Sequence, residues 1–368
     1  MADYASYNDE AMKIKQAAIL PKSPRPIALI GAGGIVKDAH LPAYQMAGFE
    51  VMGIYDPELA KAKSLQAQFG MVKNTYGTME ELIRDGQHAG AVFDIAVPAS
   101  KTLSILEQLP DGSAVLIQKP MGETMEEARA ILERCEQKRL VAAVNFQLRF
   151  APYITASRQL FEEGLLGQVY DMEVKVGVFT PWHLWDFLFD LPRMEILYHS
   201  IHYIDLIRSF LGNPSKVYAS TIKHPKMPEL ASTRSTIIMD YDEYTQARVM
   251  TNHGHEFGLD HQESYLKIEG TKGAVKIRIG LSLDYPRGMP PKMEYTLLED
   301  KQGWRELPLE GGWFPHAFVG TMAALQRFYL GETDILPHAT ADAYDTMRVT
   351  EAAYQSSDHG GTPLKDIK

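Results

Sequence analysis

The sequence predicts a two-domain α/β protein, in which a doubly wound parallel sheet is followed by an α+β domain with an open, mostly antiparallel sheet. Three observations predict this fold class. The length of 368 residues suits two domains of about 150 residues or more each. The first half alternates short apolar runs with helical segments, which favours βαβ units. Beyond residue 147, strand-like segments follow one another directly, which favours antiparallel pairing.

The first domain is expected to span residues 27–147. Residues 1–26 form an extension, because Pro21, Pro24 and Pro26 interrupt any helix that begins near residue 12. The expected strands are 27–30, 50–55, 91–97, 113–117 and 140–145, and the expected helices are 35–45, 58–69, 78–84, 101–109 and 124–138.

The second domain is expected to span residues 148–368. Turn signals such as Gly270-Thr271-Lys272-Gly273 separate its strands, so an open sheet with helices on one side is predicted. The expected strands are 169–178, 216–222, 235–241, 245–251, 264–269 and 274–279, and the expected helices are about 196–210, 314–330 and 339–356.

Composition excludes several classes of partner. Lys+Arg number 37 against 47 Asp+Glu, a net charge of −10, and no dense basic block offers itself to nucleic acid. No apolar run reaches the roughly 18 residues that a membrane-spanning helix needs. The first twenty residues lack the features of a signal peptide, and the single cysteine, Cys135, cannot form an intramolecular disulfide. A cytoplasmic protein is therefore expected.

A glycine-rich turn follows the first strand and indicates a dinucleotide site. Gly31 permits the tight turn, Gly33 lets the backbone approach a pyrophosphate, and Gly34 precedes a helix whose N-terminus stabilises negative charge. The third position of the fingerprint is Val36 instead of glycine, so the motif is incomplete, and a plain βα turn is the alternative. A Rossmann domain that binds a nicotinamide cofactor is the stronger interpretation.

An acidic residue at the end of the next strand indicates which cofactor is bound. Asp56 lies 25 residues after Gly31, near the spacing of about 20 at which a carboxylate accepts the adenosine ribose hydroxyls. A carboxylate also repels a 2′-phosphate, and Pro57, not arginine, follows it. NAD is therefore predicted, with NADP as the less favoured alternative.

Four further strings appear in a fixed order: Ala39–Tyr44, Gln118–Pro120, Asn145–Phe150 and Ser200–Leu206. Together with the glycine turn, they resemble the glucose–fructose oxidoreductase, inositol dehydrogenase and rhizopine-catabolism (Gfo/Idh/MocA) family over residues 27–356. The resemblance implies an NAD(P)-dependent oxidoreductase acting on a hydroxyl of a sugar, inositol or related polyol. It also implies a homo-oligomer, a dimer or tetramer, formed through the second sheet.

The resemblance implies candidate catalytic residues as well. The family's Glu-Lys-Pro motif matches Lys119, with Gln118 in place of the glutamate, and Lys119 also borders the cofactor. The family's Asp-x-x-x-His motif matches His202, with Tyr198 in place of the aspartate. Residues four apart share a helix face, so Tyr198 and His202 are expected to face one cleft, and His199 is a further candidate there.

Hydride transfer from an alcohol needs a base for the hydroxyl proton. We expect a neutral His202 to take that proton and a charged Lys119 to stabilise the alkoxide, with the reverse assignment open and Tyr198 in the relay. A histidine packed at the domain junction and a solvated lysine are the structural alternatives. The expected cofactor contacts are Gly31, Gly33, Gly34, Ile35, Asp56, Pro98, Lys119 and Gln147.

The segment Thr180–Phe187 contains two indoles that suit a carbohydrate. Trp182 and Trp185 offer flat apolar surfaces to sugar CH groups, although a lid that merely packs is equally consistent with the sequence. Arg149 either lies between cofactor and substrate or forms an ion pair at the domain junction. The expected substrate contacts are Lys119, Arg149, Trp182, Trp185, Tyr198, His199 and His202.

Histidines around residue 253 raise the question of a metal. His253 and His255 face one way on a strand, but His261 lacks the spacing of a third ligand. We therefore expect no metal, and these histidines to line the substrate edge or a subunit contact.

Three functions remain, led by an NAD(P)-dependent sugar or polyol dehydrogenase. The second is an enzyme of the same fold that keeps its NAD and oxidises a sugar transiently to permit elimination or glycoside cleavage. The third is a dinucleotide-binding regulator without chemistry, against which Lys119 and His202 argue.

Overall fold

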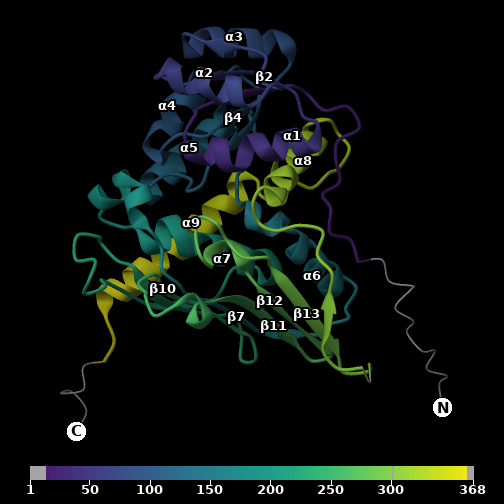
Figure 1. Ribbon diagram of the computed structural model, residues 1–368, viewed down its shortest axis with the longest axis vertical. Coiled ribbons are helices and arrows are strands. Elements are labelled where there is room, and N and C mark those ends of the chain that lie inside the picture. The colour runs from purple at the N-terminus through teal and green to yellow at the C-terminus, as the bar shows by residue number, and fades with distance from the viewer. Residues whose placement is uncertain (1–13, 301, 363–368) are drawn as a thin grey trace, which may run out of the picture.

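The protein is seen here as a computed structural model, which describes residues 14–300 and 302–362. The described residues form a six-stranded and an eight-stranded sheet. Figure 1 shows the first sheet with its helices at one end of the molecule and the second sheet at the other. This arrangement confirms the predicted fold class. The predicted extension lies partly outside the described residues, since residues 1–13 are not among them.

The first sheet is parallel, with the strand order β3-β2-β1-β4-β5-β6. Strands β1, β4 and β5 are buried along their whole length because helices cover both faces of the sheet. The order reverses between β1 and β4, which is where doubly wound sheets bind ligands. The strands are β1 (Ile27–Ile30), β2 (Val51–Tyr55), β3 (Thr75–Tyr76), β4 (Val92–Ile95), β5 (Ala114–Ile117) and β6 (Val141–Val144).

The helices of this half begin at polar caps where the sequence supplies them. Thr78 and Thr124 each accept a hydrogen bond from the backbone N–H three residues on, at 3.2 Å. Helix α3 runs longer than predicted because Gly86 does not end it; Gly86 lets the helix approach the ring of Phe93. The helices are α1 (Leu41–Ala47), α2 (Leu59–Gln68), α3 (Met79–Ala89), α4 (Thr102–Leu106) and α5 (Met125–Gln137), with a π-turn, η1 (Val36–His40), before α1.

The second sheet has the strand order β14-β13-β12-β11-β7-β10-β9-β8. Its pairs are antiparallel except β7 and β10, which run parallel in the middle of the sheet. The strands are β7 (Val169–Gly177), β8 (Lys216–Ile222), β9 (Arg234–Asp240), β10 (Gln246–Asn252), β11 (Glu263–Gly270), β12 (Gly273–Arg278), β13 (Lys292–Leu297) and β14 (Arg305–Leu307). The prediction missed β13, β14 and helix α6 (Pro152–Glu162).

Helix α8 (His316–Tyr329) belongs to the second half of the chain but packs on the first sheet. Its Phe318 and Met322 share a buried cluster with Leu29 and Val92 of that sheet. The predicted division at residue 147 therefore separates two sheets but not two independent cores, because one helix of the later segment completes the earlier core.

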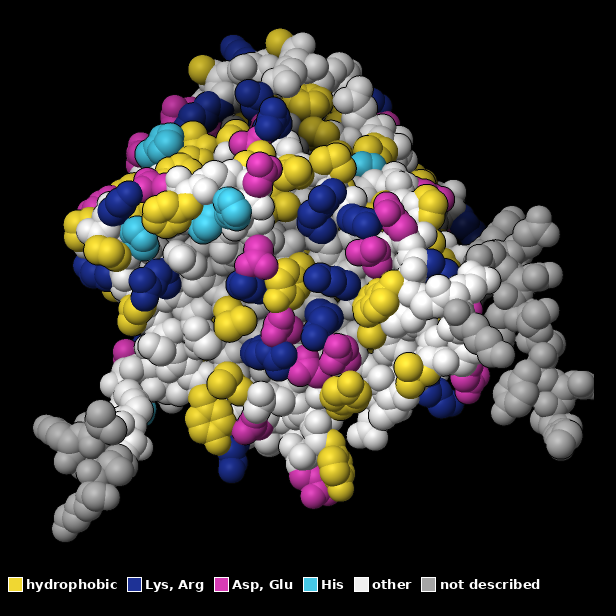
Figure 2. All heavy atoms as spheres, turned by 60° about the horizontal axis from the view of Figure 1, so that its bottom comes forward, with side chains coloured by type: hydrophobic (Ala, Val, Ile, Leu, Met, Phe, Trp, Pro, Cys, Tyr) yellow, Lys and Arg dark blue, Asp and Glu magenta, His cyan; other side chains and the backbone are white. Residues whose placement is uncertain are grey.

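The remaining helices cover one face of the second sheet. Helix α7 (Ile201–Leu211), continuous with a π-turn, η6 (Ile196–Ser200), and helix α9 (Thr340–His359) lie on the side facing the first sheet (Figure 1). The other face is open, and Figure 2 shows charged side chains of both signs interspersed with hydrophobic ones on it. None of the described helices is long and apolar enough to cross a membrane.

Candidate active site

The glycine turn after β1 has the geometry of a dinucleotide site. Gly31 has φ +110°, and a Cβ there would lie 2.3 Å from the carbonyl oxygen of Ala96, so glycine is required. Gly33 and Gly34 are exposed, and a Cβ on either would meet nothing within 4 Å. The turn therefore presents open backbone, which suits the close approach of a pyrophosphate.

Asp56 lies at the carboxyl end of β2, beside this turn. Its two carboxylate oxygens each accept a backbone hydrogen bond at 2.8 Å, from Ala32 and from Glu58. A carboxylate oxygen has a second lone pair, so each can accept one further bond, as a ribose diol requires. The residue is half-buried and its orientation is fixed before any ligand arrives.

The other expected cofactor contacts lie at the same edge of the sheet. Pro98 is exposed just before the short turn Ala99–Lys101, and Ile35 is half-buried beside the glycine turn. Gln147 is 1% exposed, and its side-chain oxygen has no hydrogen-bond partner among the described residues. An unpartnered buried acceptor fits a ligand that brings its own donor.

Lys119 lies just beyond the carboxyl end of β5, where the sequence places it. Its Nζ donates a 2.7 Å hydrogen bond to the carbonyl oxygen of Tyr198 and lies 5.9 Å from the centroid of the Tyr198 ring. Burial lowers the pKa of Lys119 to about 8. Near neutral pH this amine can thus both hold and release a proton.

Tyr198 holds Lys119 in place through its backbone carbonyl, and its hydroxyl is bonded to a third residue. Its hydroxyl donates a 2.9 Å hydrogen bond to Glu123, and burial, followed by that carboxylate, raises the pKa of Tyr198. A phenol that stays protonated and is bonded elsewhere is a poor relay. The geometry therefore argues against the expected catalytic role of Tyr198 and favours a positioning role.

His202 is buried on the first turn of α7. It is 7% exposed, its Nδ1 has no partner among the described residues, and its ring meets Trp313 edge-on at 5.2 Å between centroids. Burial, followed by electrostatic interactions with Lys119 and His199, lowers the pKa of His202 well below its ordinary value. The imidazole is therefore neutral at physiological pH, and its strength as a base is reduced.

A buried polar cluster lies behind these residues. His40 Nδ1 is 2.7 Å from Asp94 Oδ2, and the hydroxyl of Tyr44 donates to the same oxygen at 2.7 Å. Asn145 Nδ2 lies 3.4 Å from His40 Nε2 and donates to Gln118 at 3.0 Å. Gln118 thus ties the segment that carries Lys119 to the buried cluster.

Arg149 forms an ion pair, which is the second of the two roles expected for it from the sequence. Its guanidinium donates two bonds to Asp205, at 2.6 and 2.5 Å, one to Asp342 at 2.5 Å, and one to the carbonyl of Pro337 at 2.5 Å. The residue is 7% exposed and all three of its nitrogens are engaged. This geometry argues against the expected substrate contact.

The tryptophan segment divides into a buried and an accessible part. Trp182 is 6% exposed and packs with Leu188, Met194 and Leu230, as expected of a structural lid. Trp185 is half-buried, and Phe187, 48% exposed, meets the Tyr198 ring at 5.7 Å. Trp185 and Phe187 are therefore the aromatic residues of this segment that a substrate beside Tyr198 could meet; Phe187 was not predicted.

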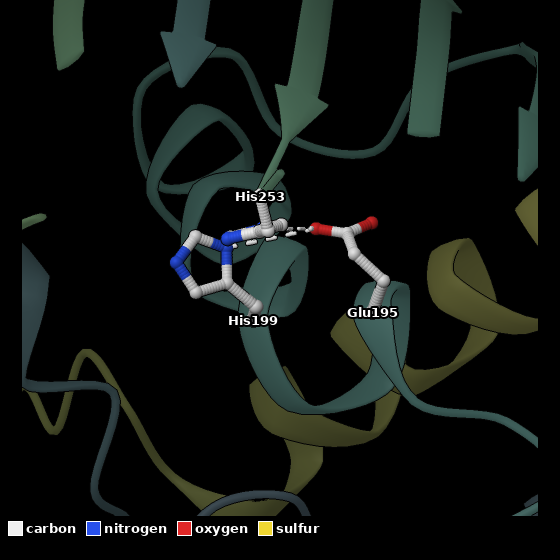
Figure 3. Close-up of side chains that lie close together, drawn as sticks. All are labelled: Glu195, His199 and His253. Carbon is white, nitrogen blue, oxygen red and sulfur yellow. Dashed lines mark hydrogen bonds and ion pairs between the residues drawn. The ribbon is translucent and has the colours of Figure 1, made fainter. Parts of the chain in front are cut away.

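His199 and His253 converge on a carboxylate that sequence reasoning missed. Glu195 Oε1 lies 3.3 Å from His253 Nε2 and 3.6 Å from His199 Nδ1 (Figure 3). Burial, followed by electrostatic interaction with His253, lowers the pKa of His199 to about 4. No sequence signal pairs Glu195 with His253, which lies 58 residues further on.

Two family models match the chain. The first, described as an oxidoreductase family with an NAD-binding Rossmann fold, matches residues 25–146. The second, described as the GFO/IDH/MocA C-terminal domain, matches residues 154–276. The matches cover the first sheet and much of the second.

Named relatives are similar over most of their length. A D-apiose dehydrogenase of Rhizobium rhizogenes is 25% identical over 349 residues, 91% of this chain and 96% of that relative. A D-xylose 1-dehydrogenase (NADP(+)) of Haloferax volcanii is 25% identical over 260 residues, 70% of this chain and 76% of that relative.

Solved structures share the fold at low identity. An oxidoreductase from Agrobacterium radiobacter, in complex with NAD+, L-tartaric acid and magnesium, has a TM-score of 0.73 and 23% identity over 92% of this chain and 98% of its own. An aldose-aldose oxidoreductase from Caulobacter crescentus, complexed with glycerol, has a TM-score of 0.75 and 17% identity over 92% of this chain and 99% of its own.

Proposed function

The chain belongs to the GFO/IDH/MocA family of oxidoreductases, and from this premise we propose that it transfers hydride between NAD and a secondary hydroxyl or keto group of a sugar, glycoside or polyol. One observation carries the proposal. Lys119, an amine whose pKa is lowered to about 8, lies at the cofactor edge of the first sheet and close enough to His202 to lower the pKa of that imidazole. The relatives named for D-apiose and D-xylose support a carbohydrate substrate.

We propose that Lys119 is the group that accepts the hydroxyl proton. A proton-transfer group works best when its pKa lies near the operating pH, which favours Lys119 over the deeply buried His202. Neutral Lys119 accepts the hydroxyl proton during oxidation, and the Tyr198 carbonyl keeps its Nζ in place. Neutral His202 orients the same hydroxyl by a hydrogen bond. When bound, the nicotinamide supplies the carbon that accepts or returns hydride.

The residues around the glycine turn fit NAD. Open backbone at Gly33 and Gly34 would hold the pyrophosphate, and Asp56 would accept the ribose hydroxyls. The unpartnered oxygen of Gln147 offers an acceptor to the cofactor's amide. Asp56 would also repel the 2′-phosphate of NADP, which supports NAD as the preferred cofactor.

Replacing Asp56 by asparagine tests this preference. Asparagine keeps the shape but removes the charge, so we expect the ratio of NADP to NAD affinity to rise at least about tenfold, or about 1.4 kcal/mol. Titration of both cofactors by isothermal calorimetry measures the ratio. An exposed aspartate outside the site, Asp260, replaced by asparagine is the control. An unchanged ratio in Asp56→Asn would remove Asp56 from the ribose.

A panel of sugars, inositols and glycosides, assayed with NAD and NADP for net formation of reduced cofactor, tests the function itself. Turnover of at least one substrate is the expected result. Bound cofactor without net reduction, together with altered glycoside products, would replace the proposal by transient oxidation. Bound cofactor with no product on any substrate would favour a dinucleotide-binding regulator.

We also propose a cytoplasmic homo-oligomer formed through the open face of the second sheet. Tyr170 and Tyr218 are 39% and 49% exposed on its strands β7 and β8. Light scattering is expected to give at least twice the mass of one chain, and Tyr218→Glu to lower it by placing a charge in the contact. A wild-type protein whose measured mass equals that of one chain would refute the proposed oligomer.

A further inference from the structure

A buried cluster of two histidines and one glutamate lies beside the proposed active site and has no role in the chemistry described above. Glu195 immediately precedes the π-turn η6 and His199 lies within it, while His253 follows β10. The side chains of Glu195 and His253 are 0% exposed, and that of His199 is 21% exposed. Figure 3 shows the three side chains converging from these separate elements.

The distances in this cluster suit metal ligands better than hydrogen-bonded partners. One potential ligand atom from each residue lies within 4.8 Å of the other two. Glu195 Oε1 is 3.3 Å from His253 Nε2 and 3.6 Å from His199 Nδ1. Charge-assisted N–H···O bonds are shorter, about 2.7–2.9 Å. Tetrahedral ligands at about 2.0–2.2 Å from a cation are separated by about 3.3–3.6 Å, which matches both values.

Two atoms of the cluster have no hydrogen-bond partner among the described residues. They are Glu195 Oε2 and His199 Nδ1. An incompletely satisfied carboxylate is costly to bury. A bound cation would supply the missing partner and a compensating charge.

Outer hydrogen bonds hold the ligand atoms in position. Thr180 Oγ1 lies 2.8 Å from His253 Nδ1; when Nδ1 donates to it, Nε2 presents its lone pair to the cluster. The hydroxyl of Ser200 donates to Glu195 Oε1 at 2.7 Å. Metal-binding histidines and carboxylates characteristically have such partners.

We propose that Glu195, His199 and His253 bind a divalent first-row transition cation, with zinc as the representative ion. Two imidazoles and one carboxylate favour such an ion over magnesium or calcium, which prefer oxygen ligands. Three protein ligands leave a coordination position open. Because His199 follows Tyr198, whose carbonyl holds Lys119, the site lies beside the proposed active site. Cation binding itself does not depend on the proposed function.

The test measures metal bound by the full chain after chelator treatment and dialysis against Zn²⁺ or Co²⁺. We expect one tightly bound equivalent per chain by elemental analysis, a rise in Tm with Zn²⁺, and visible d–d absorption of Co²⁺ with nitrogen ligands. None of these readouts requires NAD, a sugar or turnover. Dehydrogenase activity without metal binding would overturn this proposal alone, and metal binding without activity would overturn the proposed function alone.

Variants locate the bound ion. Glu195→Gln and His253→Gln are expected to weaken Zn²⁺ affinity by more than about 100-fold, because loss of an outer partner already costs about 10–100-fold. Thr180→Val, which keeps all three ligands, should give an intermediate loss of about tenfold. His261→Gln removes an exposed histidine outside the cluster and should bind as the wild type does.

Unchanged affinity in Glu195→Gln and His253→Gln, or binding lost equally in His261→Gln, would overturn the site. If either cluster variant fails to fold, the wild-type Co²⁺ spectrum decides. Absence of nitrogen-ligated bands at one equivalent refutes the proposal, and their presence supports it.

Discussion

Replacing Lys119 by methionine is expected to lower kcat for sugar oxidation by about 10²–10⁴-fold, the range that a positioned acid–base group contributes. Methionine has a similar length but cannot take a proton. Cofactor affinity should change far less than kcat, because the glycine turn and Asp56 supply most of the proposed contacts. Steady-state kinetics with a substrate found in the panel, together with calorimetric NAD titration, measure the two effects separately.

Lys119→Arg separates the two roles that a lysine could have. Arginine keeps the positive charge but does not release its proton in proteins. If Lys119 accepts the hydroxyl proton, the arginine variant should lose nearly as much activity as the methionine variant. If the lysine only stabilises an alkoxide by its charge, the arginine variant should retain much of the wild-type activity. His202 would then be the base. Lys101→Met, at an exposed lysine with no proposed role, is the control.

The pH dependence of the reaction rate also tests the assignment of Lys119 as the base. Because burial lowers the pKa of Lys119 to about 8, the neutral amine becomes the main form above that pH. The groups around it are the phenol of Tyr198 and the imidazoles of His199 and His202, whose pKa shifts leave all three uncharged in this range. Oxidation should therefore accelerate as pH rises through about 8, and reduction should slow. A flat profile in the wild type from pH 7 to 9 would contradict Lys119 as the base.

The ends of strands and helices, and the residues placed there, could be predicted from the sequence because they depend on local patterns. The strand before Gly31 and the strand before Lys119 are short apolar runs bounded by turns, so their ends, and the residues placed there, follow from the chain itself. The same holds for the predicted helix starts at residues 78 and 124, where Thr78 and Thr124 cap the helices. These features locate the cofactor edge of the first sheet.

The features that escaped prediction depend on contacts between distant segments. Whether β7 and β10 pair parallel is decided by strands that come between and after them in the sequence. A helix over about residues 314–330 was predicted, but its residue pattern does not say on which sheet α8 packs. Glu195 and His253 come from different elements, and the π-turn that aligns His199 with Glu195 has no recognisable sequence signal.

Replacing Arg149 by methionine is expected to destabilise the fold by about 3–5 kcal/mol, the usual cost of breaking a buried ion pair from one side. Asp205, 1% exposed, would keep Thr346 as a partner at 2.9 Å but lose both guanidinium bonds. Burial raises the pKa of Asp205, and Arg149 opposes that rise. Without Arg149 the pKa of Asp205 rises further, and protonation of Asp205 removes the unpaired buried charge. The loss of stability in Arg149→Met should therefore be smaller at pH 5 than at pH 8. Denaturant unfolding at both pH values measures this.

Two comparisons separate an ion pair from a substrate contact at Arg149. Arg84 pairs with Asp85 at 3.0 Å on the surface, where both are well exposed, so Arg84→Met should cost less than about 1 kcal/mol. Adding Asp205→Asn to Arg149→Met should restore part of the lost stability, because it removes the unpaired charge. The folded fraction of Arg149→Met should keep its KM within about twofold. If Arg149→Met instead raised KM tenfold and left the free energy of unfolding unchanged, Arg149 would contact the substrate. Unchanged stability would mean that the guanidinium makes no bonds on which the fold depends.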